Sequence, residues 1–460
     1  MKPTRLHPSP HKNLTRPKKT IWQRVGAVFW TLAFILLLAC VAAICTGIFL
    51  YFKQQSTSVA PAPGQKAQLF GDQESPKIRP HGVVVATESE KLYSAQEVGT
   101  LIRQTQPNYK GLQTNVTMQL FKYRIQDANG ATEDIYARVF IPESGKNLPV
   151  LSFAPGTTGI DDSCAASLED PAKRNWANYV SHMLAYASNG YVPVITDYEG
   201  MRDPKRVHHY MVGDLEGRAV LDAAQSLTQL GLTKDRIDIE KVLVAGYSQG
   251  GHAALWADQL ANTYAPSLKL RGVVGFGPVT DVRQTLTDTT RGANILWFGP
   301  YLLRSYQDWY GTEYNLASIL KSPYHENLAA DVAKNCIDTN IAYWGNRDIN
   351  KVYTPAFIEA MKSGSLQAFN PTFDQQLQSN LAGAVKTSRP KLINHGKLDN
   401  VVLPAQSDSA VKRMCGLGES VVYKIYPDAT HYNTMAKSFD DTLVWMKAVL
   451  SGSTPTSTCK

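Results

Sequence analysis

One short motif supplies the residue types of a serine nucleophile. Gly246-Tyr247-Ser248-Gln249-Gly250 is a GxSxG pattern, preceded by the apolar run KVLVAG and followed by a stretch of helical character. A nucleophilic serine needs a strained strand-to-helix turn to project its hydroxyl above a sheet, and small neighbours let the backbone close there. The pattern is frequent by chance, but its position between a strand and a helix predicts a nucleophile at Ser248.

A serine hydroxyl needs a histidine to take its proton and a carboxylate to orient that histidine. Behind such a motif these partners follow in the order serine, acid, histidine, each beyond the end of a later strand. Asp399 lies just beyond the apolar run PKLIN, and His431 lies just beyond VVYKIYP. Asp408 and Asp428 are rival acids, although Asp428 is too close in sequence to His431 to orient it easily. The sequence therefore predicts a triad of Ser248, Asp399 and His431.

The other candidate bases are histidines with ordinary structural explanations. His252 follows the serine inside the predicted helix, where a satisfied packing residue is expected. His208 and His209 precede a helix, so they are interpreted as a cap or as part of a pocket wall. His395 belongs to a turn at a strand end. None of these four displaces His431 as the predicted base.

The tetrahedral intermediate of ester hydrolysis needs hydrogen-bond donors for its oxyanion. The backbone N–H of Gln249, directly after the nucleophile, is the first expected donor. A second donor is expected from the loop APGTTG that follows the apolar run PVLSF, and the Thr157 amide is the favoured candidate. Loops rich in Gly and Thr are also common without any such role.

Strand and helix patterns alternate along much of the chain and predict the scaffold for these residues. An antiparallel hairpin is expected at 116–125 and 134–142, after a short helix that opens at Ser94 with Glu97 at capping-box spacing. A buried strand at 149–153 then leads into alternating helices and strands as far as RGVVGFG. Such βαβ alternation indicates an α/β fold with a mostly parallel sheet and helices on both faces.

The alternation stops for about 110 residues and then resumes. The core is therefore expected in two parts, 80–277 and 390–460, with a helical cap at 278–389 inserted over the end of the sheet. The cap is rich in aromatic residues, and an acyl chain needs a concave apolar pocket near the nucleophile. Aromatic residues at helical spacing are more often core than pocket wall, so both interpretations stay open. The candidate substrate-binding residues are Tyr247, Trp297, Phe298, Tyr301 and Trp309.

Positive charge is concentrated at the N-terminus. The formal net charge is +8, and residues 1–24 hold seven Lys or Arg and no acid, which leaves about +1 for the rest. A nucleic-acid partner is not expected, because its basic footprint would have to lie on the folded part. Residues 25–52 carry no charge, and at about 1.5 Å per residue they exceed the roughly 30 Å hydrocarbon core of a bilayer. They predict an N-terminal transmembrane helix.

The charge distribution also predicts the orientation of this helix. Because basic residues precede it and only Lys53 follows closely, residues 1–24 are expected to be a cytoplasmic tail, with the catalytic part outside the cytoplasm. Residues 53–79 are rich in Ser, Pro and Gly and should form a flexible stalk. The lipid bilayer is then a partner of the protein. The alternative is cleavage after the apolar segment, which would release a secreted protein.

The cysteine pattern agrees with an oxidising compartment. Cys40 and Cys45 lie within the apolar segment and are interpreted as packing residues. An even number in an exported domain permits two disulfides, and four buried thiols are the alternative. No CxxC or His/Cys cluster indicates a metal site, and no GxGxxG in a strand-to-helix setting indicates a nucleotide cofactor. The cysteines of the exported part are Cys164, Cys336, Cys415 and Cys459.

Several longer segments carry a more specific signal than GxSxG. They are APGTTG, DDSCAAS, GYVPVITDYEGM, HHYMVG, GYSQGGHAALWA, HGKLDNVVLPAQSD and YPDATHYNTM. From about Gln113 to the C-terminus, the chain resembles the secretory lipases of the lipase A type, in the α/β-hydrolase superfamily. The resemblance implies a capped lipase or carboxylesterase with the same triad. It also implies disulfides between Cys164 and Cys336 and between Cys415 and Cys459.

These observations predict a serine hydrolase of carboxylic esters that acts through an acyl-enzyme intermediate. Acyl transfer to an alcohol by the same triad is one alternative, and a catalytically silent binding module on this fold is another. Peptide hydrolysis is less favoured, since no propeller-type repeat is present. No cofactor is expected. Oligomeric state, acyl chain length and alcohol moiety cannot be predicted from these patterns.

Overall fold

The structure, a computed structural model, describes four stretches of the chain, which are residues 80–232, 235–334, 336–345 and 348–459. The predicted basic tail (1–24), transmembrane helix (25–52) and stalk (53–79) lie outside these residues and stay predictions. Within the described stretches, no helix combines the length and the apolar character that crossing a bilayer requires.

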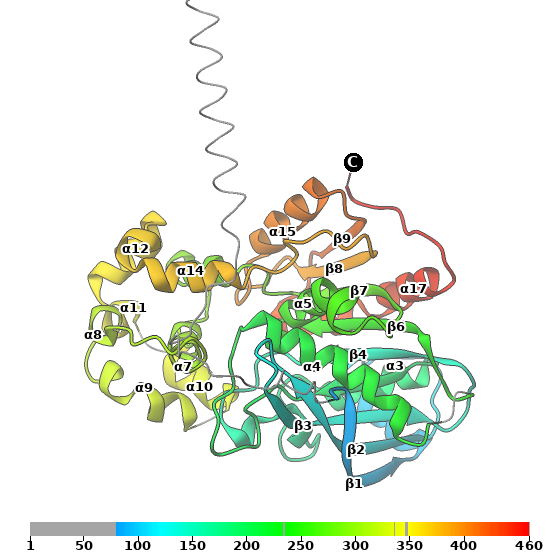
Figure 1. Ribbon diagram of the computed structural model, residues 1–460. Helices are drawn as coiled ribbons and strands as arrows, with labels where there is room; N and C mark the ends of the chain where they lie inside the picture. Colours follow the sequence, from blue (N-terminus) through cyan, green and yellow to red (C-terminus); the bar gives the residue numbers. More distant parts are fainter. Residues whose placement is uncertain (1–79, 233–234, 335, 346–347, 460) are drawn as a thin grey trace, which may run out of the picture. The chain divides into compact units, whose positions relative to one another are not determined.

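A sheet of nine strands runs through the described part of the chain in the order β1-β2-β3-β5-β4-β6-β7-β8-β9 (Figure 1). The strands are β1 (Val83–Tyr93), β2 (Val116–Gln126), β3 (Thr132–Pro142), β4 (Leu148–Ala154), β5 (Val192–Thr196), β6 (Ile237–Tyr247), β7 (Leu270–Phe276), β8 (Lys391–Gly396) and β9 (Val421–Tyr426). β1 to β3 pair antiparallel, as do β3 and β5, whereas the neighbours from β5 to β9 are all parallel. The prediction of a mostly parallel sheet is confirmed.

The hairpin and the short helix predicted near the start of the core are both present. β2 and β3 pair without interruption from Val116 opposite Pro142 to Gln126 opposite Thr132, which is the predicted hairpin. Helix α2 (Ala95–Thr105) opens with a complete capping box, because Ser94 and Glu97 each accept a backbone N–H of the other.

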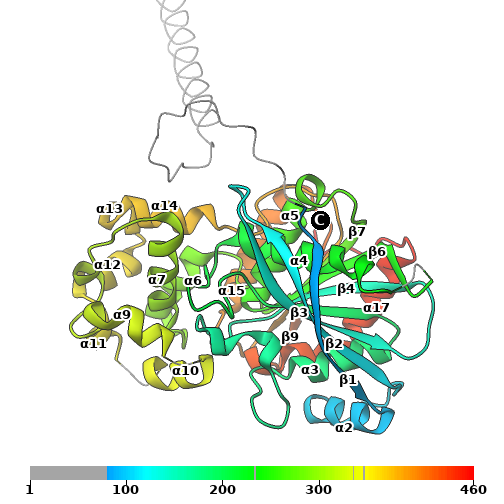
Figure 2. The same ribbon diagram turned by 60° about the horizontal axis from the view of Figure 1, so that its bottom comes forward.

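Helices cover both faces of the sheet (Figure 2). The side chains of α4 (Gly213–Ser226), α5 (Gln249–Tyr264) and α15 (Pro404–Gly416) pack in one buried cluster with the sheet. Those of α2, α3 (Tyr179–Ser188) and α17 (Phe439–Leu450) pack in another. Alternate residues of each central strand point into the two clusters, since successive strand side chains face opposite sides.

Two elements differ from the sequence-based expectation. Strand β1 was not predicted, because it is an edge strand with mostly exposed residues and lacks the alternation of a half-buried strand. The closing helix, expected as one piece, is divided into α16 (Thr434–Lys437) and α17. The break falls at Ser438, whose hydroxyl donates to the Thr434 carbonyl, and such local bonds compete with regular helix geometry.

The segment between β7 and β8 forms the helical cap, which stands beside the sheet in Figure 1 and again in Figure 2. Its helices are α6 (Val282–Asp288), α7 (Phe298–Tyr310), α8 (Leu316–Ile319), α9 (Tyr324–Ala333), α10 (Ile337–Gly345), α11 (Ile349–Val352), α12 (Pro355–Ser363), α13 (Leu366–Phe369) and α14 (Pro371–Ser379). They pack around a largely aromatic and aliphatic cluster, which core residues such as Tyr210, Leu215 and Val401 join. This cluster is separate from the two clusters of the sheet.

Candidate active site

The turn between β6 and α5 holds Ser248 in an unusual backbone conformation. Its φ of 57° and ψ of −115° are rare for a residue with a side chain and cost about 1–3 kcal/mol. Gly246 and Gly250 make the turn possible. A Cβ on Gly246 would collide with the Gly250 carbonyl, and one on Gly250 would collide with that of Ala154. The Ser248 N–H donates to the Phe276 carbonyl at 3.0 Å, which fixes the turn to β7.

The three residues predicted as a triad form a continuous row of hydrogen bonds. His431 Nε2 lies 3.0 Å from Ser248 Oγ, and His431 Nδ1 lies 2.7 Å from Asp399 Oδ2. Ser248 is 7% exposed, and the other two are 4% exposed. The row thus connects the serine hydroxyl through the imidazole ring to a buried carboxylate.

Asp399 is built to stay ionised. Its Oδ1 accepts the backbone N–H groups of Val401 and Val402, both at 2.9 Å. Burial alone would raise the pKa of Asp399, but attraction and hydrogen bonding from His431 and His395 outweigh burial and hold the pKa well below its usual range. An ionised carboxylate at Nδ1 fixes the tautomer that leaves Nε2 free to accept a proton from Ser248.

The rival residues have other partners. His395 lies in β8, with Nδ1 2.7 Å from Ser407 Oγ and Nε2 3.3 Å from Asp399, so it supports the acid and does not contact Ser248. Sequence reasoning placed His395 in a turn and missed this role. Asp428 is exposed and pairs with Lys437, whereas the partner of His431 Nδ1 is Asp399.

His252 is a satisfied buried residue, as expected. Its Nδ1 lies 2.8 Å from Glu216 Oε2, and its Nε2 lies 2.8 Å from the Asn380 carbonyl, where the cap ends. Glu216 itself is fully buried and also accepts from Gln249 Nε2 at 2.7 Å. Sequence reasoning missed Glu216, because an acid on an amphipathic helix is normally read as part of the solvated face. The other rival acid, Asp408, accepts from Tyr423.

The two residues predicted to supply oxyanion donors lie in the elbow and in the loop after β4. Gln249 begins α5, where the first four N–H groups have no intrahelical acceptor and the helix dipole favours negative charge. The APGTTG loop follows β4 and packs against the elbow, since a Cβ added to Gly156 would lie 2.9 Å from the Tyr247 carbonyl oxygen. Thr157 is half-buried, and its Oγ1 lies 2.8 Å from the Tyr210 hydroxyl.

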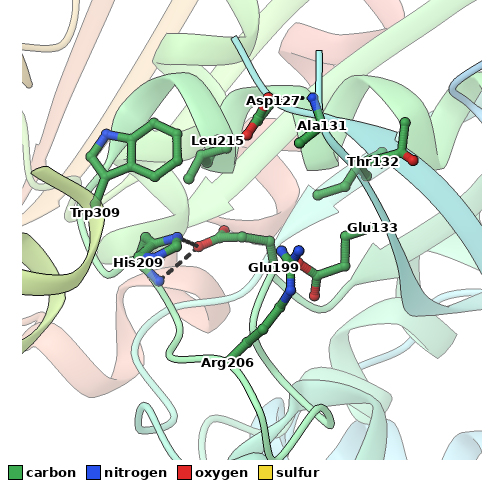
Figure 3. A pocket seen from close by; sticks show the side chains of 10 residues that line it. Asp127, Ala131, Thr132, Glu133, Glu199, Arg206, His209, Leu215 and Trp309 are labelled. Carbon is green, nitrogen blue, oxygen red and sulfur yellow. Dashed lines mark hydrogen bonds and ion pairs between the residues drawn. The ribbon is translucent and has the colours of Figure 1, made fainter. Parts of the chain in front are cut away.

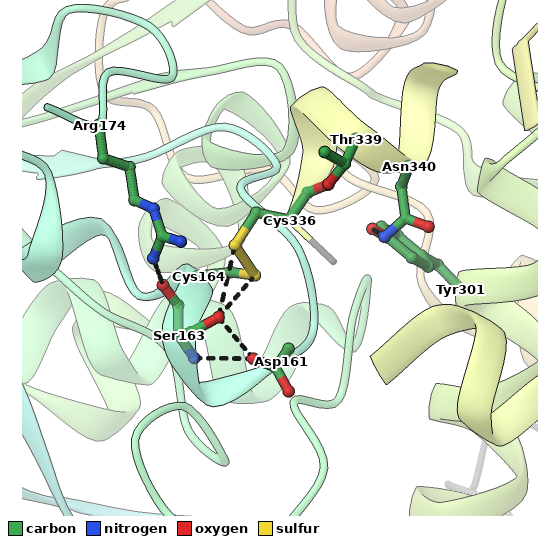
Figure 4. The surroundings of a disulfide bond; sticks show 8 residues. All are labelled: Asp161, Ser163, Cys164, Arg174, Tyr301, Cys336, Thr339 and Asn340. Atoms are coloured by element: carbon green, nitrogen blue, oxygen red, sulfur yellow. Dashed lines mark hydrogen bonds between the residues drawn. A yellow bond between two sulfur atoms is a disulfide. The ribbon is translucent and has the colours of Figure 1, made fainter. Parts of the chain in front are cut away.

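Two disulfides are present with the pairing that the family resemblance implies. Cys164 and Cys336, with Cα atoms 5.2 Å apart, join the segment after the APGTTG loop to the start of α10 in the cap (Figure 4). Cys415 and Cys459, also 5.2 Å apart, join α15 to the C-terminal segment. The first bond therefore links core to cap, and the second lies within the core.

The five predicted substrate-binding residues occupy different surroundings. Tyr247 lies beside the triad, with its ring centre 4.9 Å from that of His431. Trp297, Phe298 and Tyr301 are at most 5% exposed and belong to the buried cluster of the cap. Trp309 is partly exposed and lines a separate pocket with His209 and Glu199.

A small pocket of about 20 Å³ lies where the edge of the sheet meets the cap (Figure 3). Trp309 and His209 line one side of it, and Glu133, Glu199 and Arg206 line another. No triad residue lines the pocket, and its volume suits a water molecule or two and not an acyl chain. Trp309 thus faces this pocket, and His209 is a wall residue there.

The fold is that of the α/β-hydrolase lipases and esterases. Candida antarctica lipase A in its closed state has a TM-score of 0.61 at 19% identity, covering 83% of this chain and 84% of that one. The rice cell wall degrading esterase LipA from Xanthomonas oryzae has a TM-score of 0.63 at 19% identity, covering 81% and 97%. At such identities these likenesses establish the fold.

Sequence comparison identifies the family. The secretory lipase model matches residues 179–458, and the chain belongs to the secretory lipase family. It is 24% identical to Lipase A of Moesziomyces aphidis over 77% of this chain and 76% of that protein. It is 22% identical to the trichothecene C-3 esterase of Fusarium sporotrichioides over 72% and 74%. The protein is accordingly a carboxylic ester hydrolase.

Proposed function

We propose that the protein hydrolyses carboxylic esters through an acyl-enzyme formed on Ser248, with His431 as general base and Asp399 as its orienting acid. The observation that supports this most directly is the row of two hydrogen bonds from Ser248 Oγ through the His431 ring to Asp399. Nucleophile, base and orienting acid are thereby within the reach that acyl transfer requires.

In the first half of the reaction, Ser248 Oγ attacks the ester carbonyl carbon while His431 Nε2 takes the hydroxyl proton. The carbonyl oxygen becomes an oxyanion, and we propose that the backbone amides of Gln249 and Thr157 donate to it. When the bond from carbon to the alcohol oxygen breaks, His431 returns its proton to the leaving alcohol. Asp399 stays ionised throughout and stabilises the imidazolium.

In the second half, a water molecule takes the place of the alcohol. His431 removes a proton from this water, whose oxygen attacks the acyl carbon, and the proton then passes to Ser248 Oγ as the carboxylic acid leaves. We propose that Tyr247, beside His431, borders the bound ester, with the buried cap residues Trp297, Phe298 and Tyr301 as further candidates.

We also infer that this chemistry takes place outside the cytoplasm, because the chain belongs to a secretory family and carries two disulfides. Residues 25–52, uncharged and preceded by seven basic residues, support the proposal of a single-pass anchor with the catalytic part on the far side of the membrane. Release after cleavage of this segment is the alternative.

The test is Ser248→Ala, with Ser181→Ala as a matched control. Ser181 is a buried serine on α3 with no hydrogen-bond partner for its hydroxyl among the described residues, so its loss should be harmless. Ser248→Ala should lower kcat for a p-nitrophenyl ester by at least about three orders of magnitude. It should also abolish labelling by a fluorophosphonate, whereas Ser181→Ala keeps both.

Stoichiometric labelling of Ser248→Ala would assign the nucleophile to another serine. A wild-type protein that neither labels nor turns over any ester would be a binding module. Product analysis with an added alcohol distinguishes hydrolysis from acyl transfer, because only a transferase would return mostly the new ester.

A further inference from the structure

The segment from His208 to Val212 is the meeting point of three parts of the molecule. It follows β5 in the chain and leads into α4, and its sequence HHYMV has no role in the reaction as described above. Its side chains and backbone contact the APGTTG loop, the nucleophile elbow and cap helix α7.

Toward the APGTTG loop, two tyrosines provide the contacts. The hydroxyl of Tyr210, a residue 1% exposed, lies 2.8 Å from Thr157 Oγ1. Burial raises the pKa of Tyr210 well above its usual value, so the phenol keeps its proton. Tyr198 donates its hydroxyl to the Pro155 carbonyl at 2.7 Å, and its ring stacks on His208 with centres 5.2 Å apart. Both tyrosines thus hold this loop through their hydroxyl groups.

Toward the elbow, the contacts end on the side chain of Gln249. Its Nε2 donates to Glu216 Oε1 at 2.7 Å and lies 2.9 Å from His208 Nε2, which must then accept. His208 therefore carries its proton on Nδ1, 3.1 Å from the Glu199 carbonyl oxygen. Glu216 Oε1 also accepts the Met211 N–H at 3.0 Å, which joins the segment to the elbow a second time.

Toward the cap, two polar side chains of α7 bind the backbone of the segment. Ser305 Oγ donates to the Tyr210 carbonyl at 2.9 Å, and the Tyr306 hydroxyl donates to the Met211 carbonyl at 3.3 Å. The Tyr210 ring meets the ring of Phe298 edge to face, with centres 5.7 Å apart. A shift of α7 would therefore reach Tyr210 directly.

We propose that Tyr210 is a positioning residue that holds the Thr157 donor at its distance from the Gln249 donor, and that it acts through its hydroxyl contact to Thr157. The inference rests on the proposed function. Oxyanion donors must lie about 2.7–3.1 Å from the oxyanion, and a misplacement of about 1 Å can cost up to a hundredfold in rate. One short segment that touches Thr157 and Gln249 and is bound by the cap sets this spacing.

The first experiment compares Tyr210→Phe with Tyr353→Phe in the full chain. Both variants remove one buried phenolic hydroxyl, but the Tyr353 hydroxyl donates to the Leu296 carbonyl within the cap, whereas the Tyr210 hydroxyl lies against Thr157. Tyr210→Phe should lower kcat about ten- to a hundredfold with KM changed less than about twofold. It should weaken binding of a trifluoromethyl ketone, which forms a tetrahedral adduct, by a similar factor. Tyr353→Phe should change the melting temperature and leave kcat unchanged.

The second experiment is a double-mutant cycle with Thr157→Val. If Tyr210 acts through Thr157, the double variant should be no slower than the slower single variant, because the second change removes nothing further. Thr157→Ser keeps a hydroxyl and should restore most of the rate that Thr157→Val loses. If Tyr210→Phe does not fold, the comparison of kcat between Thr157→Val and Thr157→Ser still tests the proposal.

Unchanged kcat in Tyr210→Phe, strictly multiplicative effects in the cycle, or equal rates for Thr157→Val and Thr157→Ser would each overturn the proposal. All of these outcomes leave the proposed function intact as long as the wild-type protein is labelled at Ser248. Retained turnover in Ser248→Ala would instead remove the function itself.

Discussion

The carboxyl ends of the parallel strands and the cap hold their residues in place by different means. Ser248, Asp399 and His431 each follow a parallel strand, β6, β8 or β9, within a few residues, so the backbone ladder sets their mutual positions. The cap has no such ladder among its described residues, and its helices are held by an apolar cluster. Backbone pairing tolerates many side chains, whereas packing depends on each one. The predicted triad therefore lies where backbone pairing fixes it, whereas the predicted substrate-binding residues of the cap depend on side-chain packing.

A few specific links join the two regions. The Asn294 N–H of the cap donates to the Asn400 carbonyl at 2.7 Å, directly after Asp399 in the chain. The Ile337 N–H donates to the Thr158 carbonyl at 2.7 Å, next to the first disulfide. His209 of the core pairs with Asp308 of α7 at 3.0 Å.

The largest effect is expected from the acid of the triad. Asp399→Asn should lower kcat by about four orders of magnitude, because an amide at Nδ1 no longer stabilises the correct tautomer or the imidazolium. Asp428→Asn is the matched control, since Asp428 is exposed, stands nearer His431 in sequence and pairs with Lys437. Its kcat should stay within about twofold of the wild-type value. Steady-state kinetics on a p-nitrophenyl ester measures both, and a large loss in Asp428→Asn alone would exchange the two assignments.

The same contrast explains what the sequence could and could not predict. The triad residues were accessible because strand-end positions follow from apolar runs and chain order. Glu216 and Tyr210 were not, because their contacts cross from one helix or loop to another and leave no periodicity in the sequence. Among the aromatic residues of the cap, Tyr301 is fully buried and Trp309 is partly exposed on a separate pocket. Sequence spacing alone could not distinguish the two residues, because it does not show which part of the molecule each face of the helix packs against.

An effect of intermediate size is expected from loss of either disulfide. The two disulfides should differ in their effect on kcat. By the loop-entropy relation, closing 172 residues through Cys164–Cys336 is worth about 5 kcal/mol, and closing 44 through Cys415–Cys459 about 4 kcal/mol. Double replacement of either pair by serine should therefore lower the free energy of unfolding by a similar amount, about 2–5 kcal/mol.

Activity should distinguish the two pairs where stability does not. Loss of Cys164–Cys336 should lower kcat several-fold even at a temperature where the variant is fully folded, because this bond holds the segment after the APGTTG loop to the cap. Loss of Cys415–Cys459 should leave kcat unchanged. Denaturant unfolding and kinetics at the same low temperature make the comparison, and equal kcat for both variants would separate the first disulfide from the site.

The smallest effect concerns the charged link between core and cap, and it should depend on pH. Burial would lower the pKa of His209, but hydrogen bonds and attraction from Glu199 and Asp308 outweigh it and raise the pKa above its ordinary value of about 6.5. Burial would raise the pKa of Glu199, but His208 and His209 outweigh it and lower the pKa to about 2.

The two shifts set the pH window. A raised histidine pKa stabilises the fold below about pH 6.5, and this contribution is lost as the pH rises through the folded value. A lowered glutamate pKa stabilises the fold above about pH 4.5, and this contribution is lost as the pH falls toward about 2. Near pH 5.5 both contribute, and near pH 9 the histidine term is gone.

His209→Gln keeps a side chain that can hydrogen-bond but removes the charge, so it should destabilise the protein by about 1 kcal/mol at pH 5.5 and by much less at pH 9. The matched control is His325→Gln, a cap histidine whose ion-pair partner Glu326 is its own neighbour on α9. Denaturant unfolding at the two pH values measures the difference. If His209→Gln lost equal stability at both, the link between core and cap would be a matter of packing against Trp309, and the charge on His209 would have no part in it.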